Sequence, residues 1–112
     1  MMRRVGLVAL FVLLTPGVFA QPAALNDQQQ LGQLLFTQSC GVCHLKPQIN
    51  ANLFGPPLSK DSAGGRDEVM RQVIMNGTPR MPGFKYHFEP AQIDAVIAYL
   101  KTVPTSPPAT PR

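Results

Sequence analysis

This sequence of 112 residues has few cysteines and little net charge, and it lacks the alternating pattern of β-strands. Cys40 and Cys43 are the only cysteines, and a disulfide between them would close a very short loop and stabilise little. No segment alternates apolar and polar residues over the length of a strand, and no internal repeat occurs. These absences favour one small, all-α domain.

The net charge is too small to indicate a polyanionic partner. The formal charge is +4, and two of these positive charges, Arg3 and Arg4, precede an apolar run near the N-terminus. Without these two arginines the remaining chain carries +2, which gives no reason to expect binding to nucleic acid or to an anionic membrane.

Residues 1–20 have the features of a secretory signal peptide. Two arginines precede an apolar run over residues 5–14, a Pro-Gly pair ends that run, and V-F-A closes the segment at Ala20. The run is too short to span a bilayer comfortably. We expect cleavage after Ala20 and export to the periplasm, with an uncleaved N-terminal membrane anchor as the alternative.

The predicted domain spans residues 21–103 and contains three short helices. Asn26 or Asp27 can cap a first helix over about residues 27–39. A second helix fits residues 66–76, where Gly77 ends it. The third begins with Pro90 at a first-turn position, and its apolar face comprises Ile93, Val96, Ile97 and Leu100.

Loops fill the space between these helices. Residues 45–62 and 78–88 contain prolines and glycines that interrupt any helix, and loops of this length in a small domain are often functional. Residues 104–112 include four prolines, so we expect a Pro-rich disordered tail.

The two cysteines lie in the sequence C-G-V-C-H, residues 40–44. A thioredoxin-like dithiol would start a helix after a strand, but Cys40 ends a predicted helix. Tetrahedral zinc needs four ligands; His87 could complete a set with the motif, but the adjacent Cys43 and His44 cannot easily bind one ion. Cys-x-x-Cys-His is the attachment signature of c-type haem. It predicts thioether bonds from Cys40 and Cys43 and an imidazole ligand to iron from His44.

Beyond this motif the sequence resembles the class I cytochrome c family. Gly32, Phe36 and Cys40 reproduce the spacing of the family's N-terminal helix, and Val96 and Tyr99 fit the positions of the C-terminal helix that cross this glycine. Gly55-Pro56-Pro57-Leu58 is similar to the family's Gly-Pro-x-Leu segment. Tryptophan and the lysine cluster of mitochondrial members are absent. The resemblance implies a cytochrome c fold of three short helices and long loops around one covalently attached haem.

The resemblance also implies the second axial ligand. A low-spin electron carrier usually has a thioether sulfur there, and Met81 lies in the proline-stiffened loop where the family carries it. His87 is the alternative ligand, while Met70 and Met75 fit the core of a helix better. The backbone carbonyl of Pro56 is expected to orient the His44 ring by accepting its hydrogen bond.

We therefore expect an exported monohaem cytochrome that is not an enzyme. It would be a monomer that shuttles single electrons between redox proteins, such as a dehydrogenase, an oxidase or a reductase. The alternatives are a haem enzyme or gas sensor with an open sixth site, and a tethered haem subunit of a periplasmic dehydrogenase.

Three sets of residues are expected around the haem. The apolar crevice would include Leu53, Phe54, Leu58 and Phe84; the propionate candidates are Asn52, Arg66, Arg71 and Arg80; the docking patch would include Val42, Lys46, Arg80 and Lys85.

Overall fold

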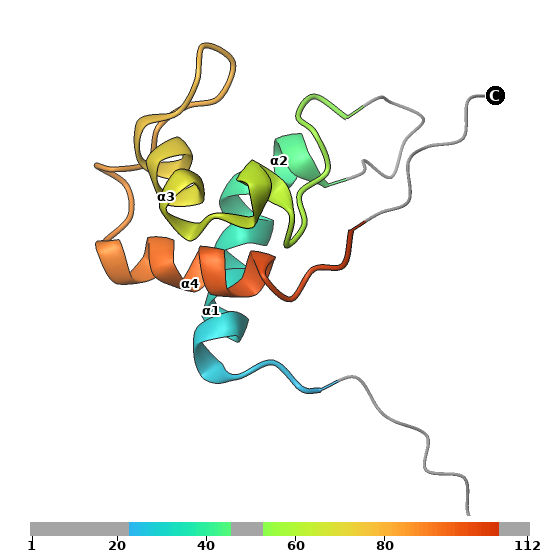
Figure 1. Ribbon diagram of the computed structural model, residues 1–112. Coiled ribbons are helices and arrows are strands. Elements are labelled where there is room, and N and C mark those ends of the chain that lie inside the picture. Colours follow the sequence, from blue (N-terminus) through green and yellow to red (C-terminus); the bar gives the residue numbers. More distant parts are fainter. Residues whose placement is uncertain (1–22, 46–52, 106–112) are drawn as a thin grey trace, which may run out of the picture.

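The computed structural model describes residues 23–45 and 53–105 and is helical throughout its regular parts (Figure 1). The described residues form no strand beyond an isolated bridge between Thr78 and Met81. The prediction of an all-α fold with three short helices is confirmed. The predicted signal peptide, residues 1–20, lies outside the described residues. The elements are α1 (Asp27–Leu35), the π-helical turn η1 (Phe36–Cys40), α2 (Gly41–His44), the 3-10 turn η2 (Ser62–Gly65), α3 (Asp67–Asn76) and α4 (Pro90–Leu100).

The first helix continues further than its sequence pattern indicates. Asn26 caps it as predicted, because its side chain accepts from the Gln29 N–H at 2.9 Å and the Gln29 side chain accepts in return at 3.0 Å. We predicted an end near residue 39, but η1 and α2 carry the helix to His44. The π-turn inserts an extra residue into the helix, and this local change has no signature in the apolar spacing.

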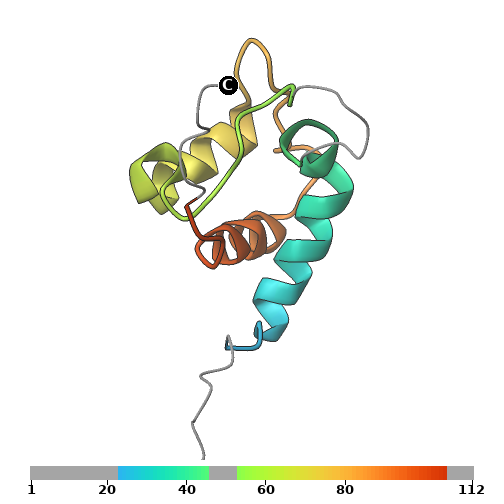
Figure 2. The ribbon, with the colours of Figure 1, turned by 90° about the vertical axis from the view of Figure 1, so that its right-hand side faces the viewer.

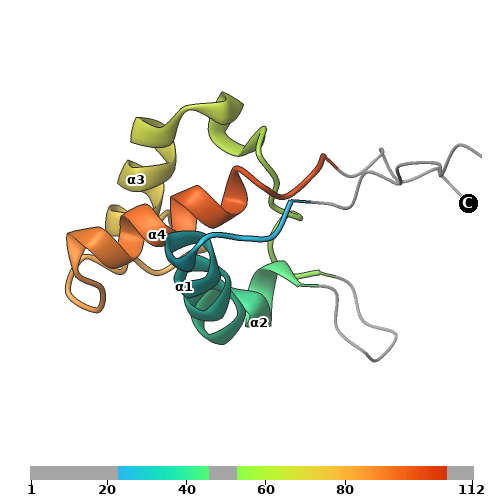
Figure 3. The same ribbon diagram turned by 90° about the horizontal axis from the view of Figure 1, so that it is seen from below.

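α4 lies across α1, and the contact is centred on Gly32 (Figures 2 and 3). A Cβ atom on Gly32 would lie 1.9 Å from the Ala95 carbonyl oxygen and 2.9 Å from the Tyr99 Cβ. The predicted crossing is therefore present, with the backbone of Ala95 making the closest approach. Next to it, the Phe36 and Tyr99 ring centroids are 5.6 Å apart.

The hydrophobic core fills the space enclosed by the long helix, α3 and α4. The predicted apolar face of α4 is buried in full, and Pro90 occupies its first turn behind a Glu89–Gln92 capping box. An ion pair between Arg71 and Asp94 joins α3 to α4 at the edge of this core. The buried core residues are Phe36, Cys40, Met70, Ile74, Ile93, Val96, Ile97 and Leu100.

The segment after α4 packs along the segment that contains η2. The Lys60 N–H donates to the Val103 carbonyl at 2.9 Å, and Lys101 Nζ donates to the Gly65 carbonyl at 3.2 Å and to Asp67 Oδ1, at the start of α3, at 2.6 Å. Thr105 also donates a side-chain hydrogen bond to Asp61. Of the predicted tail, residues 106–112 lie outside the described residues. Among the helices that the structure describes, none is long and apolar enough to cross a membrane.

Candidate cofactor site

A cavity of about 510 Å³ opens between α2, α3 and the two long loops. Its volume falls within the range of sites for small molecules and cofactors. The C-G-V-C-H motif contributes to one wall and the loop that carries Met81 contributes to another. The lining residues are Cys43, His44, Phe54, Gly55, Pro56, Leu58, Ser62, Ala63, Val69, Met70, Val73, Ile74, Thr78, Arg80, Met81, Pro82 and Leu100.

The backbone of the first loop fixes the orientation of the His44 ring. Nδ1 of His44 donates to the Pro56 carbonyl at 2.7 Å, so the hydrogen bond that we expected at Pro56 is present. The Gly55 N–H donates to the Cys43 carbonyl at 2.8 Å. A Cβ atom on Gly55 would lie 2.7 Å from Cε1 of His44; glycine therefore allows the loop to lie against the ring. With Nδ1 engaged, Nε2 is the nitrogen left for a metal.

The two cysteines are free thiols beside this histidine. Cys40 is buried, and Cys43 is partly exposed and lines the cavity. Burial raises the pKa of the Cys40 thiol, and the neighbouring Cys43 raises it further. Both cysteines, together with His44 and Met81, also line a smaller hollow of about 70 Å³. The motif thus presents both sulfur atoms to the region of the cavity.

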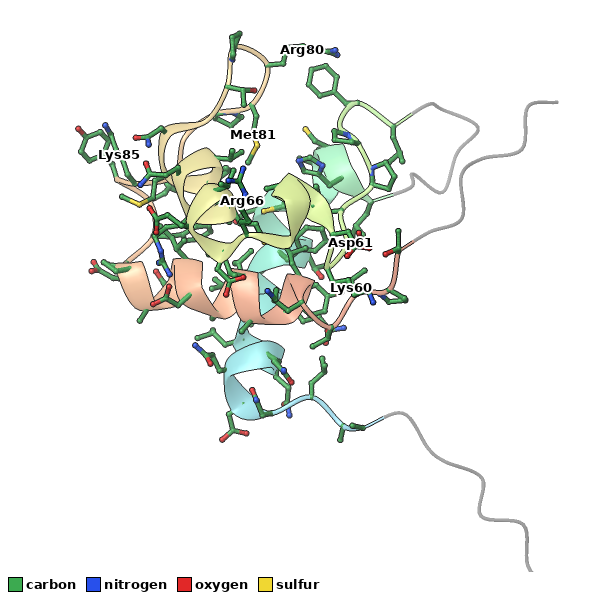
Figure 4. All side chains as sticks on the ribbon, viewed as in Figure 1. Lys60, Asp61, Arg66, Arg80, Met81 and Lys85 are labelled. Atoms are coloured by element: carbon green, nitrogen blue, oxygen red, sulfur yellow. The ribbon has the colours of Figure 1, made fainter. Side chains whose placement is uncertain are left out.

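Met81 is placed by a tightly closed loop after α3. Gly77 ends the helix at a positive φ of 70°, where a Cβ atom would lie 2.3 Å from the Met81 carbonyl oxygen. The Thr78 N–H donates to that carbonyl at 2.8 Å, and the Phe84 N–H donates to the Ile74 carbonyl at 2.9 Å. These contacts join the base of the loop to α3, and the Met81 side chain reaches from it into the interior (Figure 4).

The other candidates for an axial ligand are placed differently. Met70 is only 3% exposed and belongs to the core, although it also lines the large cavity. Met75 packs against the core from outside and lines neither hollow. His87 is exposed, with its ring centroid 6.3 Å from that of Phe84, and lines neither hollow. The structure brings Met81, and not His87, to the cavity that His44 lines.

A zinc site finds no support in the described residues. They contain no group of three or more His, Cys, Asp or Glu side chains that could hold a metal ion. His87, which the four-ligand set would require, lies away from the cavity.

The expected propionate candidates do not share one location. Arg80 lines the cavity, and its Cζ lies 5.0 Å from the centroid of the Phe54 ring. Arg71 is paired with Glu68 within α3 and with Asp94 of α4, and it does not line the cavity. Arg66 is exposed and lines neither hollow, and Asn52 lies outside the described residues.

The expected apolar crevice and docking patch are present in part. Phe54 and Leu58 line the large cavity, Phe84 lines the smaller hollow, and Leu53 lines neither. Val42, the middle residue of the motif, is 84% exposed, and Lys46 lies outside the described residues. Sequence reasoning missed one apolar wall, formed by Val69 and Val73 of α3. Their spacing of four residues on a helix was the available signal.

Comparisons with known proteins agree on one family. Residues 27–100 match the family described as cytochrome c oxidase, cbb3-type, subunit III. Cytochrome c6 from Nostoc sp. is 32% identical over 98 residues, which cover 84% of this chain and 86% of that protein. Dihydro-heme d1 dehydrogenase from Pseudomonas aeruginosa is 34% identical over 110 residues, which cover 96% of this chain.

The chain spans only 20% of the length of this dehydrogenase. Among solved structures, dihydro-heme d1 dehydrogenase NirN in complex with DHE superimposes with a TM-score of 0.54 at 32% identity. That superposition covers 73% of this chain and 17% of the other.

Proposed function

The chain belongs to the family of class I c-type cytochromes, and from this we propose that it is an exported carrier of single electrons with one haem c. Proteins of this family transfer electrons with a covalently bound haem and have redox proteins as partners. The finer features are part of the proposal: ligation by His44 and Met81, a single haem, export to the periplasm and a monomeric state.

One observation carries the proposal. A single cavity of about 510 Å³ is lined by His44 and Cys43 from the motif and by Met81 from a loop distant in sequence. These groups are an imidazole, a thiol and a thioether, and the second thiol, Cys40, lines the smaller hollow together with Cys43, His44 and Met81. Together they are the set that binds haem in c-type cytochromes. The remaining lining is mostly apolar, as a porphyrin requires. The residues present therefore fit the cofactor.

Each residue has a distinct task in this proposal. Cys40 and Cys43 would hold the porphyrin covalently, because each S–H group can add across one vinyl group without consuming another reactant. His44, held by the Pro56 carbonyl, and Met81, held by its closed loop, would be the residues that hold the iron. When bound, the haem supplies an iron that accepts and releases one electron. Because both ligands are held by the surrounding backbone, little rearrangement accompanies the change of charge.

The apolar lining has an electrostatic consequence. Side chains such as Phe54, Leu58 and Val69 make the lining of the cavity largely apolar, so they would shield a bound haem from water. A low-dielectric surrounding raises the free energy of the ferric form, which has one more positive charge, and the thioether ligand acts in the same direction. We propose a relatively high reduction potential, suited to a carrier and not to an enzyme that activates a substrate.

The spectrum of the protein produced with haem attachment tests this function. We expect one haem per chain by mass and, in the ferric state, the weak long-wavelength band of an iron–thioether bond. Met81→Ala should abolish that band. Met70→Leu is the matched control, because Met70 lines the same cavity from α3, and it should retain the band. Persistence of the band in Met81→Ala would refute the ligand assignment, and rapid binding of carbon monoxide by the ferrous parent would favour an open-site sensor or enzyme.

A second candidate function rests on the relative that is longer than this chain. Since 96% of the chain aligns with one fifth of dihydro-heme d1 dehydrogenase, the domain could serve as a haem subunit docked to a dehydrogenase. Purification of the tagged protein from its own cells distinguishes the two functions. A carrier elutes as a monomer, whereas a subunit co-elutes with a larger partner in a fixed ratio.

A further inference from the structure

The segment that contains Phe54 and the segment that contains Arg80 both line the cavity and meet at its mouth. Phe54 directly precedes Gly55 and Pro56, the residues that hold the His44 ring. Arg80 directly precedes Met81. The guanidinium carbon of Arg80 lies 5.0 Å from the centroid of the Phe54 ring, and both residues line the cavity. This cation–π contact therefore connects the segment behind one predicted ligand with the segment that carries the other.

The base and the tip of the Met81 loop are held differently. Backbone hydrogen bonds from Phe84 and Lys85 to the carbonyls of Ile74 and Met75 hold the base against α3. Residues 78–80, at the tip, are exposed, and Arg80 extends outward from the loop (Figure 4). Among the described residues, no hydrogen bond or ion pair joins residues 53–58 to residues 78–83. Within the tip, Thr78 and Met81 exchange two backbone hydrogen bonds, so residues 78–81 form one closed turn that carries Met81. The position of this turn relative to residues 53–58 consequently depends on the side chains that meet across the mouth.

We propose that Arg80 and Phe54 form a clasp that holds the Met81 loop closed and so controls how often Met81 leaves the iron. The inference rests on the proposed function, since it requires Met81 to be an axial ligand. In this role Arg80 and Phe54 are positioning residues. Opening the clasp frees the loop tip, and the thioether of Met81 moves away with it.

The rate at which cyanide replaces Met81 in the ferric holoprotein measures the opening of the loop. Cyanide binds ferric iron only when the sixth position is free. At low cyanide concentration, the rate of binding is therefore proportional to the fraction of molecules in which Met81 is displaced from the iron. Both partners are exposed, and exposed cation–π contacts correspond to about a two- to fivefold change in an equilibrium constant. Arg80→Gln and Phe54→Leu should each accelerate cyanide binding by about this factor, and the double variant should bind no faster than the faster single variant. Phe54→Tyr keeps the aromatic face and should match the parent.

Lys85→Gln is a matched control. Lys85 Nζ lies 5.0 Å from the centroid of the Tyr86 ring, so this variant also removes a positive charge and a cation–π contact near the same loop. Neither residue lines the cavity, and Lys85 lies at the outer edge of the molecule, away from Met81 (Figure 4). Its cyanide rate should equal that of the parent.

The outcomes separate the clasp from the function on which it rests. If the parent lacks the iron–thioether band, the ligation by Met81 is wrong and the clasp falls with it. If the band is present and Arg80→Gln and Phe54→Leu bind cyanide at the parental rate, the clasp alone is refuted. Additive effects of the two substitutions, or an equal acceleration in Lys85→Gln, would also overturn it, because they indicate independent or general charge effects. Acceleration confined to Arg80 and Phe54, without additivity, supports the clasp.

Discussion

Replacing Gly32 by alanine should destabilise the domain, although alanine is the better helix former. In an isolated helix the change would stabilise by about 1 kcal/mol. Here the added Cβ would lie 1.9 Å from the Ala95 carbonyl oxygen, whereas an ordinary contact begins at 3.4 Å. The obstacle is backbone, so no side-chain rotation can relieve it, and α1 and α4 must move apart by about 1.5 Å.

This separation disturbs the most closely packed part of the structure. The Phe36–Tyr99 ring contact and the buried Val96 lie next to the crossing. Overpacking of a core costs about 1–3 kcal/mol, and a collision with backbone belongs at the upper end of that range. We expect a net loss of about 1–2 kcal/mol, which in a domain of this size lowers Tm by about 5–15 °C.

Thermal unfolding of the holoprotein, followed by far-ultraviolet circular dichroism, measures this loss. Gly41→Ala is the matched control in the same continuous helix. Gly41 has helical φ and ψ of −59° and −34°. Its added Cβ would lie 3.0 Å from the end of the Leu45 side chain, which can rotate away, and its nearest backbone atom would be the Phe36 oxygen at 3.7 Å, an ordinary contact. Its Tm should stay within about 3 °C of the parent. A Gly32→Ala protein as stable as the parent would refute the account of the helix crossing.

Three further predictions follow from the site and the surface. Replacing both Cys40 and Cys43 by serine should leave a chain without covalent haem and largely unfolded, since an unfilled cavity and a small core cannot offset chain entropy; a native-like helical signal in circular dichroism would contradict this. Gly55→Ala should displace the His44 ring, because the added Cβ would lie 2.7 Å from Cε1 of His44. The His44 resonances in NMR spectra of the ferric protein should therefore shift in Gly55→Ala but not in the control Pro57→Ala, and equal spectra of the two variants would argue against the contact. Electron transfer to the physiological partner should slow only a few-fold between about 10 mM and about 200 mM salt, over which the Debye length falls from about 30 Å to about 7 Å, because the chain without Arg3 and Arg4 carries a formal charge of only +2. A hundredfold decrease in stopped-flow rates would indicate a concentrated basic surface instead.

Local chemistry in the sequence determined the helices and the haem motif. Asn26 begins the first helix, Gly77 ends α3 and Pro90 begins α4, because caps and backbone restrictions act within a few residues. The motif of residues 40–44 indicated covalent haem because two thiols and an imidazole at this spacing can reach one porphyrin. The resemblance to a known family added Met81 and Pro56, which residue types alone could not select from the other methionines and prolines.

Only the tertiary structure decided which distant residues share the cavity. Both Met70 and Met75 lie in α3, yet only Met70 lines it, and His87 is excluded because its ring packs beside Phe84 instead. The extension of the first helix through a π-turn and the meeting of Arg80 with Phe54 likewise have no local signal. Local propensity acts over a few residues, whereas these contacts depend on how α1 and α4 cross at Gly32 and on how the two loops close over the space between the helices.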